Sequence, residues 1–142
     1  MRRLQHEAET ERLLKVMDVR INPKSKIMHL PMWQRQVVEI CKALSQDPKV
    51  LILDEPTSAL AKAEVEKLFA AIRKVKENDV IIIYISHKLE EVYRICDRVL
   101  VLRDGKTIDT HDIHEVNEQI LIEQMVGRKI ENLYPKKTVP IG

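Results

Sequence analysis

Two acidic residues and one histidine are the side chains of this sequence best suited to chemistry on a phosphate. Asp54 and Glu55 directly follow a short, wholly apolar run, residues 50–53. His87 lies just beyond a second apolar run, residues 80–85. If both runs are neighbouring strands of a parallel sheet, their carboxyl ends meet at the edge where ligands bind in open sheets. We therefore expect the three side chains to lie around one ligand.

Each of these side chains suits a separate step in the hydrolysis of a phosphoanhydride. The Asp54 carboxylate can hold Mg²⁺ through water, and the Glu55 carboxylate can orient or deprotonate the attacking water. The His87 imidazole can donate a hydrogen bond to a γ-phosphate oxygen or to that water. The plain alternative is that the two acids only cap the next helix and that His87 is a polar residue at a helix start. The joint occurrence of all three at two strand ends favours the catalytic interpretation.

The elements that must position these side chains form a strand–helix–strand unit. The runs at 50–53 and 80–85 are typical of strands buried on both faces of a parallel sheet. Between them, apolar residues recur at helical spacing over 61–77, which predicts a right-handed crossover helix. The sequence thus predicts an α/β fold with about three parallel strands, flanking helices and a hairpin.

Further helices and the hairpin are predicted on either side of this unit. Amphipathic spacing predicts helices at about 2–19, 32–45, 88–95 and 114–126. The dipeptide Asp104-Gly105 predicts a tight turn between strands at 98–102 and 106–109. Gly127 is placed to end the last helix, and the chain after Tyr134-Pro135 has the composition of a linker.

Composition and charge exclude several classes of protein. A chain of 142 residues with 44% hydrophobic residues can build one domain with a real core. The formal net charge of +2 is too small to predict nucleic-acid binding. The longest apolar run is far short of the roughly 20 residues that cross a bilayer. Cys41 and Cys96 form no close pair and no secretory signal precedes them, so we expect a reduced, cytosolic compartment.

Several segments together resemble the nucleotide-binding domain of ATP-binding cassette (ABC) proteins. Residues 50–60 look like the Walker B strand and D-loop of that family, and Ile85-Ser86-His87 looks like its switch histidine. Residues 30–45 are similar to the signature loop and its helix. One branch is resembled in particular, the tandem-cassette ATPases of bacterial ribose, xylose and galactose importers. The segments that resemble this branch are residues 96–99, 102–106, 125–128 and 133–135.

The resemblance implies a fold and a division of the chain. The fold would be a partial P-loop NTPase (RecA-like) domain, the rear part of the first of two cassettes. Residues 1–46 would be the remainder of a helical subdomain with the signature loop and its helix. Residues 47–130 would form the core from the Walker B strand to the switch histidine, and residues 131–142 a C-terminal linker. Without the front of such a domain, one sheet face would be exposed, which favours aggregation or pairing with another chain.

The resemblance also implies a function. The chain would be a fragment of the ATP-hydrolysing subunit of a carbohydrate importer, peripheral to the cytoplasmic face of the cell membrane. ATP and Mg²⁺ would be its cofactors. A membrane permease and a second cassette would be its direct partners, a periplasmic sugar-binding protein an indirect one, and nucleic acid would not be bound. Glu55 and His87 would be catalytic, Asp54 would bind Mg²⁺ through water, and Asp54, Ser58 and Gln34 would contact the nucleotide.

Two departures from the family pattern bear on activity. The phosphate-binding pattern GxxxxGK[ST] does not occur among these 142 residues, which contain only 3 glycines. The amide nest and the lysine that hold the β- and γ-phosphates are therefore missing. In the signature loop, Pro31, Met32 and Trp33 stand where the family has a serine and small residues. Proline has no amide hydrogen and tryptophan is too large for close approach to a phosphate, so we do not expect this loop to contact the γ-phosphate of a partner cassette. Because the phosphate-binding loop is missing, we expect no ATP turnover by the chain alone.

Two other functions stay open on the sequence. A non-enzymatic remnant, or an interaction module that pairs with an intact cassette or permease, is favoured by the missing loop and the altered signature. Chromosome-maintenance and repair ATPases share the signature, Walker B and histidine pattern. They insert a long coiled coil into the domain, and because no sustained heptads occur here this class is disfavoured.

Overall fold

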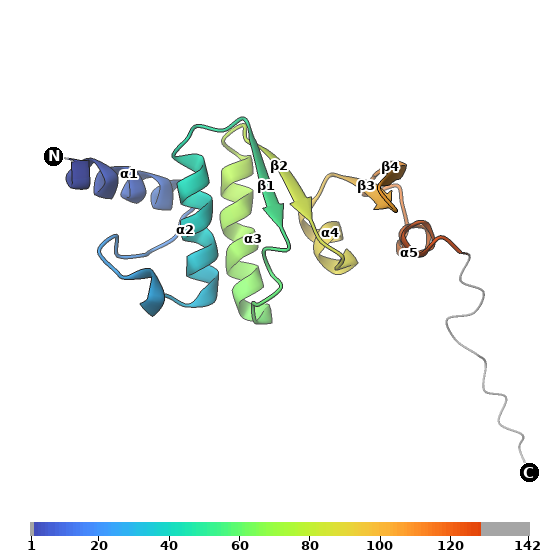
Figure 1. The fold of residues 1–142 in the computed structure, drawn as a ribbon, viewed down its shortest axis with the longest axis horizontal. Coiled ribbons are helices and arrows are strands. Elements are labelled where there is room, and N and C mark those ends of the chain that lie inside the picture. The colour runs from blue at the N-terminus through green and yellow to red at the C-terminus, as the bar shows by residue number, and fades with distance from the viewer. Residues whose placement is uncertain (1, 129–142) are drawn as a thin grey trace, which may run out of the picture. The chain divides into compact units, whose positions relative to one another are not determined.

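The computed structural model describes residues 2–128, with side chains described from residue 7 onward. These described residues form two compact units, which divide between Lys88 and Leu89. The first unit contains, in order, α1 (Arg2–Val16), the 3-10 turn η1 (Ile27–His29), α2 (Met32–Leu44), β1 (Val50–Asp54), α3 (Lys62–Lys76) and β2 (Ile81–Ile85) (Figure 1). The second contains α4 (Leu89–Ile95), β3 (Arg98–Arg103), β4 (Lys106–Asp112) and α5 (Glu118–Val126). No helix over residues 2–128 is both long enough and apolar enough to span a bilayer.

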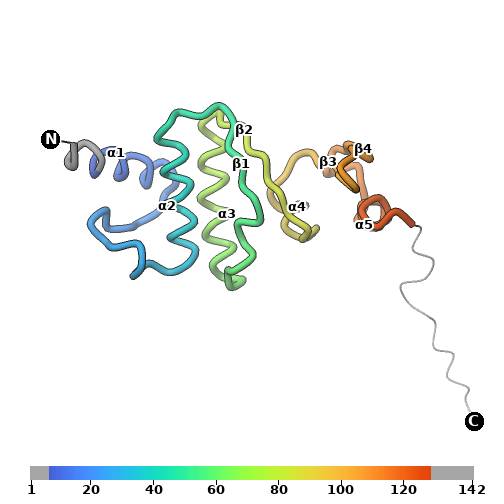
Figure 2. Tube along the Cα trace, viewed as in Figure 1, coloured from blue at the N-terminus to red at the C-terminus, as the bar shows by residue number. Residues whose placement is uncertain are grey.

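The strand–helix–strand unit is confirmed. Strands β1 and β2 pair in parallel, with a register that runs from Val50 opposite Ile81 to Asp54 opposite Ile85. Helix α3 connects them and lies alongside the pair, as the Cα trace shows (Figure 2). Its first turn is fixed by the Ala61 amide, which donates to the Glu64 carboxylate at 3.0 Å. Both strands therefore end at the same edge of the sheet.

The parallel sheet is buried on one face only, so the prediction of burial on both faces is wrong. Leu51 and Leu53 are buried, and the Tyr84 ring meets Phe69 of α3 edge-on at a centroid distance of 6.1 Å. On the opposite face, Ile52 is 61% exposed and Ile81 is 63% exposed. The described helices of this unit cover one side of the strands, which leaves the other side in water. The members of this exposed aliphatic face are Val50, Ile52, Ile81, Ile83 and Ile85.

The core of the first unit lies between the helices and the inner sheet face. The predicted apolar stripe of α2 is confirmed, since Val37, Ile40, Cys41 and Leu44 are all buried. The predicted stripe of α3 is confirmed as well, with Val65, Leu68, Phe69, Ile72 and Val75 buried. From α1 and the turn after it, Leu13, Leu14 and Met17 add to this core. The Cys41 thiol donates to the Met17 sulfur at 3.6 Å, which ties α2 to the end of α1.

The second unit is a hairpin packed on a helix. β3 and β4 are antiparallel, and Asp104 and Gly105 both have positive φ, as a two-residue hairpin turn requires. Its buried cluster consists of Val92, Val101, Ile113, Val116 and Leu121. β3 pairs with β4, so the parallel sheet of the described residues has two strands and not about three. A two-residue turn brings β3 and β4 together at little entropic cost, which favours this local pairing.

Two helix ends differ from the sequence prediction for identifiable reasons. α1 ends at Val16, before the predicted Val19, because the chain turns at Asp18 with φ of +53°. α5 begins at Glu118 and not near His114, because the Asn117 side chain accepts a hydrogen bond from the Ile120 amide at 2.9 Å and caps the helix. Gly127 ends α5 in the left-handed conformation, as predicted. The predicted linker lies outside the described residues.

We expect the two sheet faces to differ in their sensitivity to truncation. Ile72→Ala removes a side chain that is 2% exposed and should lower the free energy of unfolding by about 2–5 kcal/mol. Ile52→Ala is the matched control, because the same side chain is 61% exposed there, and should cost about 1 kcal/mol or less. Urea unfolding followed by circular dichroism measures both. Equal losses would contradict the one-sided burial of the sheet.

The Cys41 thiol should resist alkylation while the chain is folded. Burial raises the pKa of Cys41 from 9.0 to about 11, because the thiolate is poorly solvated in the core. At pH 8 the thiolate fraction is then about a hundredfold lower than in the unfolded chain. Iodoacetamide labelling of Cys96→Ala, with and without 8 M urea, measures the ratio. The raised pKa also means that its contribution to stability is complete below pH 9 and is lost as the pH rises toward 11.

Candidate functional site

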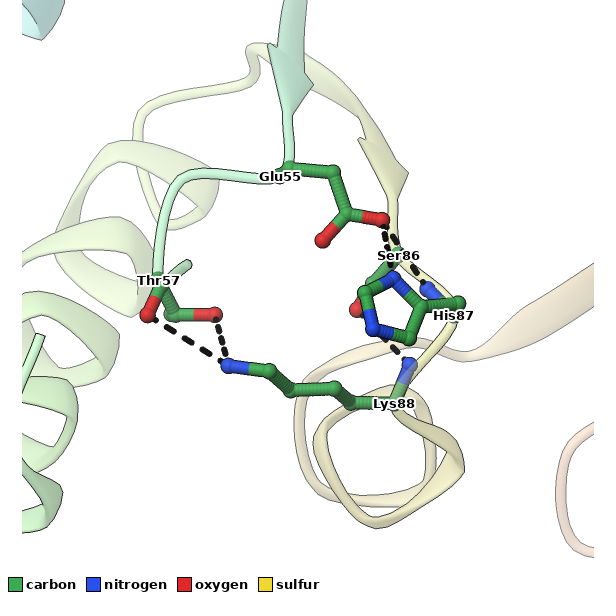
Figure 3. A network of polar contacts seen from close by, with 5 residues as sticks. All are labelled: Glu55, Thr57, Ser86, His87 and Lys88. Atoms are coloured by element: carbon green, nitrogen blue, oxygen red, sulfur yellow. Dashed lines mark hydrogen bonds and ion pairs between the residues drawn. The ribbon is translucent and has the colours of Figure 1, made fainter. Parts of the chain in front are cut away.

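The chain leaves β1 through a sharp turn at Glu55. This residue has φ of +45°, a left-handed conformation that is uncommon for a residue other than glycine. Its amide donates to the Ile85 carbonyl at 2.9 Å, so the backbone is still tied to β2 at this point. The turn ends the strand alternation and directs the Glu55 carboxylate toward the end of β2 (Figure 3).

Glu55 and His87 are brought into contact across the two strand ends. The His87 Nδ1 lies 2.6 Å from Oε1 of Glu55, and the His87 backbone amide donates to the same oxygen at 3.2 Å (Figure 3). Because an ionised carboxylate oxygen only accepts, this geometry places a proton on Nδ1 and leaves Nε2 for another ligand. The His87 side chain is 71% exposed, so a ligand can reach it.

The second carboxylate oxygen of Glu55 has an unusual environment. Oε2 is buried and has no hydrogen-bond partner. A buried carboxylate oxygen without a partner carries a desolvation cost, so such atoms are rare in folded proteins. One oxygen of Glu55 therefore holds His87, and the other is shielded from solvent in this arrangement.

Asp54 directly precedes Glu55, but its side chain lies on the exposed face of the parallel sheet. It is the last residue of β1, is exposed, and shares the exposed aliphatic face with Ile52 and Ile85 by strand alternation. Within residues 2–128 there is no cluster of three acidic, histidine or cysteine side chains that could enclose a metal ion. Mg²⁺ is commonly held by one or two carboxylates together with water and substrate phosphates. A single exposed carboxylate such as Asp54 fits that mode of binding.

The other two predicted nucleotide contacts, Ser58 and Gln34, are placed separately. Ser58 is exposed in the loop after Glu55, and its amide donates to the Glu55 carbonyl at 3.2 Å. Gln34 is in the first turn of α2 and is half-buried. The structure thus brings Glu55 and His87 together and keeps Ser58 on the same loop as Glu55. The roles of Asp54, Ser58 and Gln34 toward a nucleotide stay predictions.

The segment that resembles an altered signature loop is ordered by an arginine that the sequence analysis missed. Arg35 donates from Nε to the Leu30 carbonyl at 2.9 Å and from Nη2 to the Met28 carbonyl at 3.0 Å. These bonds fix η1 against the start of α2, where Pro31 precedes the first helical residue. The signal in the sequence was an arginine one turn into a helix that follows a loop, where its donors can satisfy loop carbonyls.

A lysine next to the histidine was also missed. The Lys88 ammonium lies 3.4 Å from the Thr57 carbonyl oxygen and 3.3 Å from its hydroxyl oxygen (Figure 3). The Lys88 amide donates to the Ser86 hydroxyl at 3.0 Å. The loop after β1 and the loop after β2 are therefore joined at two places, by the Glu55–His87 contact and by Lys88 and Thr57.

Comparison with known proteins gives the same family as the sequence motifs. A family model described as ABC transporter matches residues 2–58. The chain is 45% identical to the galactose/methyl galactoside import ATP-binding protein MglA of Fusobacterium nucleatum, over 91% of this chain and 26% of that protein. It is 44% identical to the ribose import ATP-binding protein RbsA of Hahella chejuensis, over 97% and 28%. It is 48% identical to the xylose import ATP-binding protein XylG of Thermoanaerobacter pseudethanolicus, over 91% and 26%. The chain thus spans about a quarter of the length of these relatives.

Solved structures support the fold. An ATP-binding cassette of an ABC transporter matches with a TM-score of 0.73 at 22% identity, over 84% of this chain and 48% of that one. The protein cbiO1 from Clostridium perfringens, part of the ABC transporter complex cbiONQ, matches with a TM-score of 0.69 at 28% identity, over 84% and 46%. The predicted α/β fold, a partial P-loop NTPase domain with a C-terminal hairpin, is confirmed. Together these matches confirm the resemblance to the family seen in the motifs, and the chain belongs to the ATP-binding cassette (ABC) family.

Proposed function

We propose that this chain supplies the hydrolytic edge of a nucleotide site in the ATPase subunit of an ABC-type carbohydrate importer, where hydrolysis of ATP is coupled to sugar uptake. The observation that carries the proposal is the 2.6 Å contact between Glu55 and His87 at adjacent strand ends. That edge is where open parallel sheets bind ligands. The relatives that match over nine tenths of the chain are named as import ATP-binding proteins for galactose and methyl galactoside, for ribose and for xylose.

The geometry suggests a role for each side chain. Glu55 holds the proton of His87 on Nδ1 through Oε1, and its carboxylate, part of a side chain that is 33% exposed, would serve as the general base for the attacking water. His87 then presents Nε2 toward the phosphate edge, where it can orient that water. Asp54 would hold Mg²⁺ through water, and the ion supplies charge neutralisation at the phosphates when it is bound. Ser58 and Gln34 would contact the nucleotide from the loop after β1 and from α2.

The remaining parts of the site come from outside these residues. None of the 142 residues forms the GxxxxGK[ST] pattern, so the β- and γ-phosphates of ATP would be cradled by a segment outside this sequence. The subunit would act at the cytoplasmic face of the membrane as a peripheral protein, paired with a second cassette and docked to a permease. A periplasmic sugar-binding protein would deliver sugar to that permease. The chain would not bind nucleic acid.

A second candidate function is a non-enzymatic module that pairs with an intact cassette or permease. The exposed aliphatic face favours it, because surfaces of this kind mark sites of association. Pro31, Met32 and Trp33 in the signature segment favour it as well, because they replace the groups that approach a partner's phosphate. Turnover of ATP, once a segment with the phosphate-binding loop has been added to the chain, separates the two functions.

The isolated chain should neither bind nor hydrolyse ATP at ordinary concentrations. Titration of a fluorescent ATP analogue with Mg²⁺ should give no saturation in the micromolar range, because the phosphate cradle is absent from these residues. ATPase assays should show no turnover, and Glu55→Gln should make no difference to them. Micromolar binding would show that the chain holds phosphates by groups other than those of the family.

Turnover should appear when a segment with the phosphate-binding loop completes the site, and it should then depend on the Glu55–His87 pair. Glu55→Gln and His87→Ala should each lower kcat by about 10²–10³-fold, the size of effect typical for a general base or a charge-stabilising group. Glu39→Gln, an exposed carboxyl on α2, is the matched control and should leave kcat unchanged. An active complemented site that tolerates Glu55→Gln would rule out this assignment of the base, and an inactive one would favour the second candidate function.

A further inference from the structure

The loop between β1 and α3, residues 55–61, is held from two adjacent positions of the loop that follows β2. His87 contacts Glu55 at the start of this loop, and Lys88 contacts Thr57 two residues further on (Figure 3). We propose that Lys88 is a positioning residue. It fixes residues 57–60 against the end of β2 and so keeps the Glu55 carboxylate within hydrogen-bond distance of His87. That this loop faces a nucleotide rests on the function proposed above, whereas the positioning itself does not.

The contact between Lys88 and Thr57 is suited to a structural bond. An ammonium has three donors and no acceptor. Here it lies within reach of two oxygens of one residue, the carbonyl at 3.4 Å and the hydroxyl at 3.3 Å. Thr57 is 1% exposed, so water competes little for its polar atoms. At 3.4 Å and 3.3 Å these contacts are longer than the strongest charge-assisted hydrogen bonds, so each is modest, and partial burial limits their screening by solvent.

The oxygen that Lys88 reaches also organises the loop itself. The Thr57 carbonyl accepts the Leu60 amide at 3.1 Å, and the Glu55 carbonyl accepts the Ser58 amide at 3.2 Å. These two turns carry the chain from the strand to α3. Loss of Lys88 therefore loosens a carbonyl that is part of the turn, and the loosening reaches Ser58 and Leu60 directly.

The backbone at Glu55 gives a reason for a second tether. Glu55 has a φ of +45°, and a left-handed conformation at a non-glycine residue costs free energy and persists where the surroundings hold it in place. The His87 contacts hold the Glu55 side chain, and the Ile85 carbonyl holds its amide. Lys88 holds the chain two residues beyond. The strained residue is thus fixed on both sides.

The consequence is a direct link between the histidine and the loop. Lys88 follows His87 in the chain, so a displacement of His87 also displaces Lys88 and, through it, Thr57 and Ser58. Ser58 is exposed and belongs to the segment that resembles the D-loop. A change of ligand at His87 would in this way reach the exposed part of the loop without passing through the sheet.

Amide hydrogen exchange of the ¹⁵N-labelled 142-residue chain, measured by NMR without any nucleotide, tests the inference. Lys88→Met keeps the aliphatic stem and removes the charge. It should speed exchange of the Leu60 and Ser58 amides about fivefold, which is the effect of losing one modest hydrogen bond. The Glu55 amide, bonded to the Ile85 carbonyl, should change less, and the buried amides of α2 should not change. Lys88→Arg should restore slow exchange.

Control variants separate the tether from general effects of charge and stability. Lys62→Met removes an exposed lysine at the other end of the same loop and should leave the Leu60 amide unchanged. Thr57→Val removes the hydroxyl acceptor but keeps the carbonyl, and should give a smaller increase than Lys88→Met. Unchanged exchange at Leu60 and Ser58 in Lys88→Met would overturn the inference. A uniform increase that includes α2 would also overturn it, since Lys88 would then act on global stability. Neither result depends on ATP binding, so the function proposed above succeeds or fails separately.

Discussion

The parallel pairing of β1 with β2 is the constraint on which the rest of the site depends. The register ends with Asp54 opposite Ile85, so the chain leaves both strands at the same level of the sheet. Glu55 and His87 can then meet although 32 positions separate them along the chain. A shift of one residue would turn both loops to opposite faces, because side chains alternate along a strand. Burial of one sheet face, with Leu51 and Leu53 in the core and the Tyr84 ring against Phe69 of α3, specifies that register.

The sequence predicted the elements that depend on local patterns and the meeting of Glu55 with His87. Apolar periodicity marked the buried stripes of α2 and α3, and Asp104-Gly105 marked the hairpin. The meeting of Glu55 and His87 could be expected because the ends of parallel strands share an edge. The roles of Asp54, Ser58 and Gln34 have not been tested.

What could not be predicted depends on contacts between distant segments. An apolar strand has the same pattern whether one face or two faces are covered, so the pattern alone did not show the exposure of Ile52 and Ile81. Only the missing front of the domain led to the expectation of one exposed sheet face, which is confirmed. The bonds of Arg35 to loop carbonyls and of Lys88 to Thr57 were missed because long cationic side chains carry no positional pattern. Similarly, α5 begins later than predicted because the Asn117 side chain caps the helix by accepting the Ile120 amide.

The exposed aliphatic face links the stability of the first unit to association. Five branched side chains that remain in water contribute little hydrophobic free energy to folding. That contribution is realised only when another surface covers them, and it then adds to the native state by mass action. The midpoint of thermal unfolding of this unit is consequently not a fixed property of the polypeptide. It rises with the concentration and affinity of whatever molecule excludes water from those five side chains.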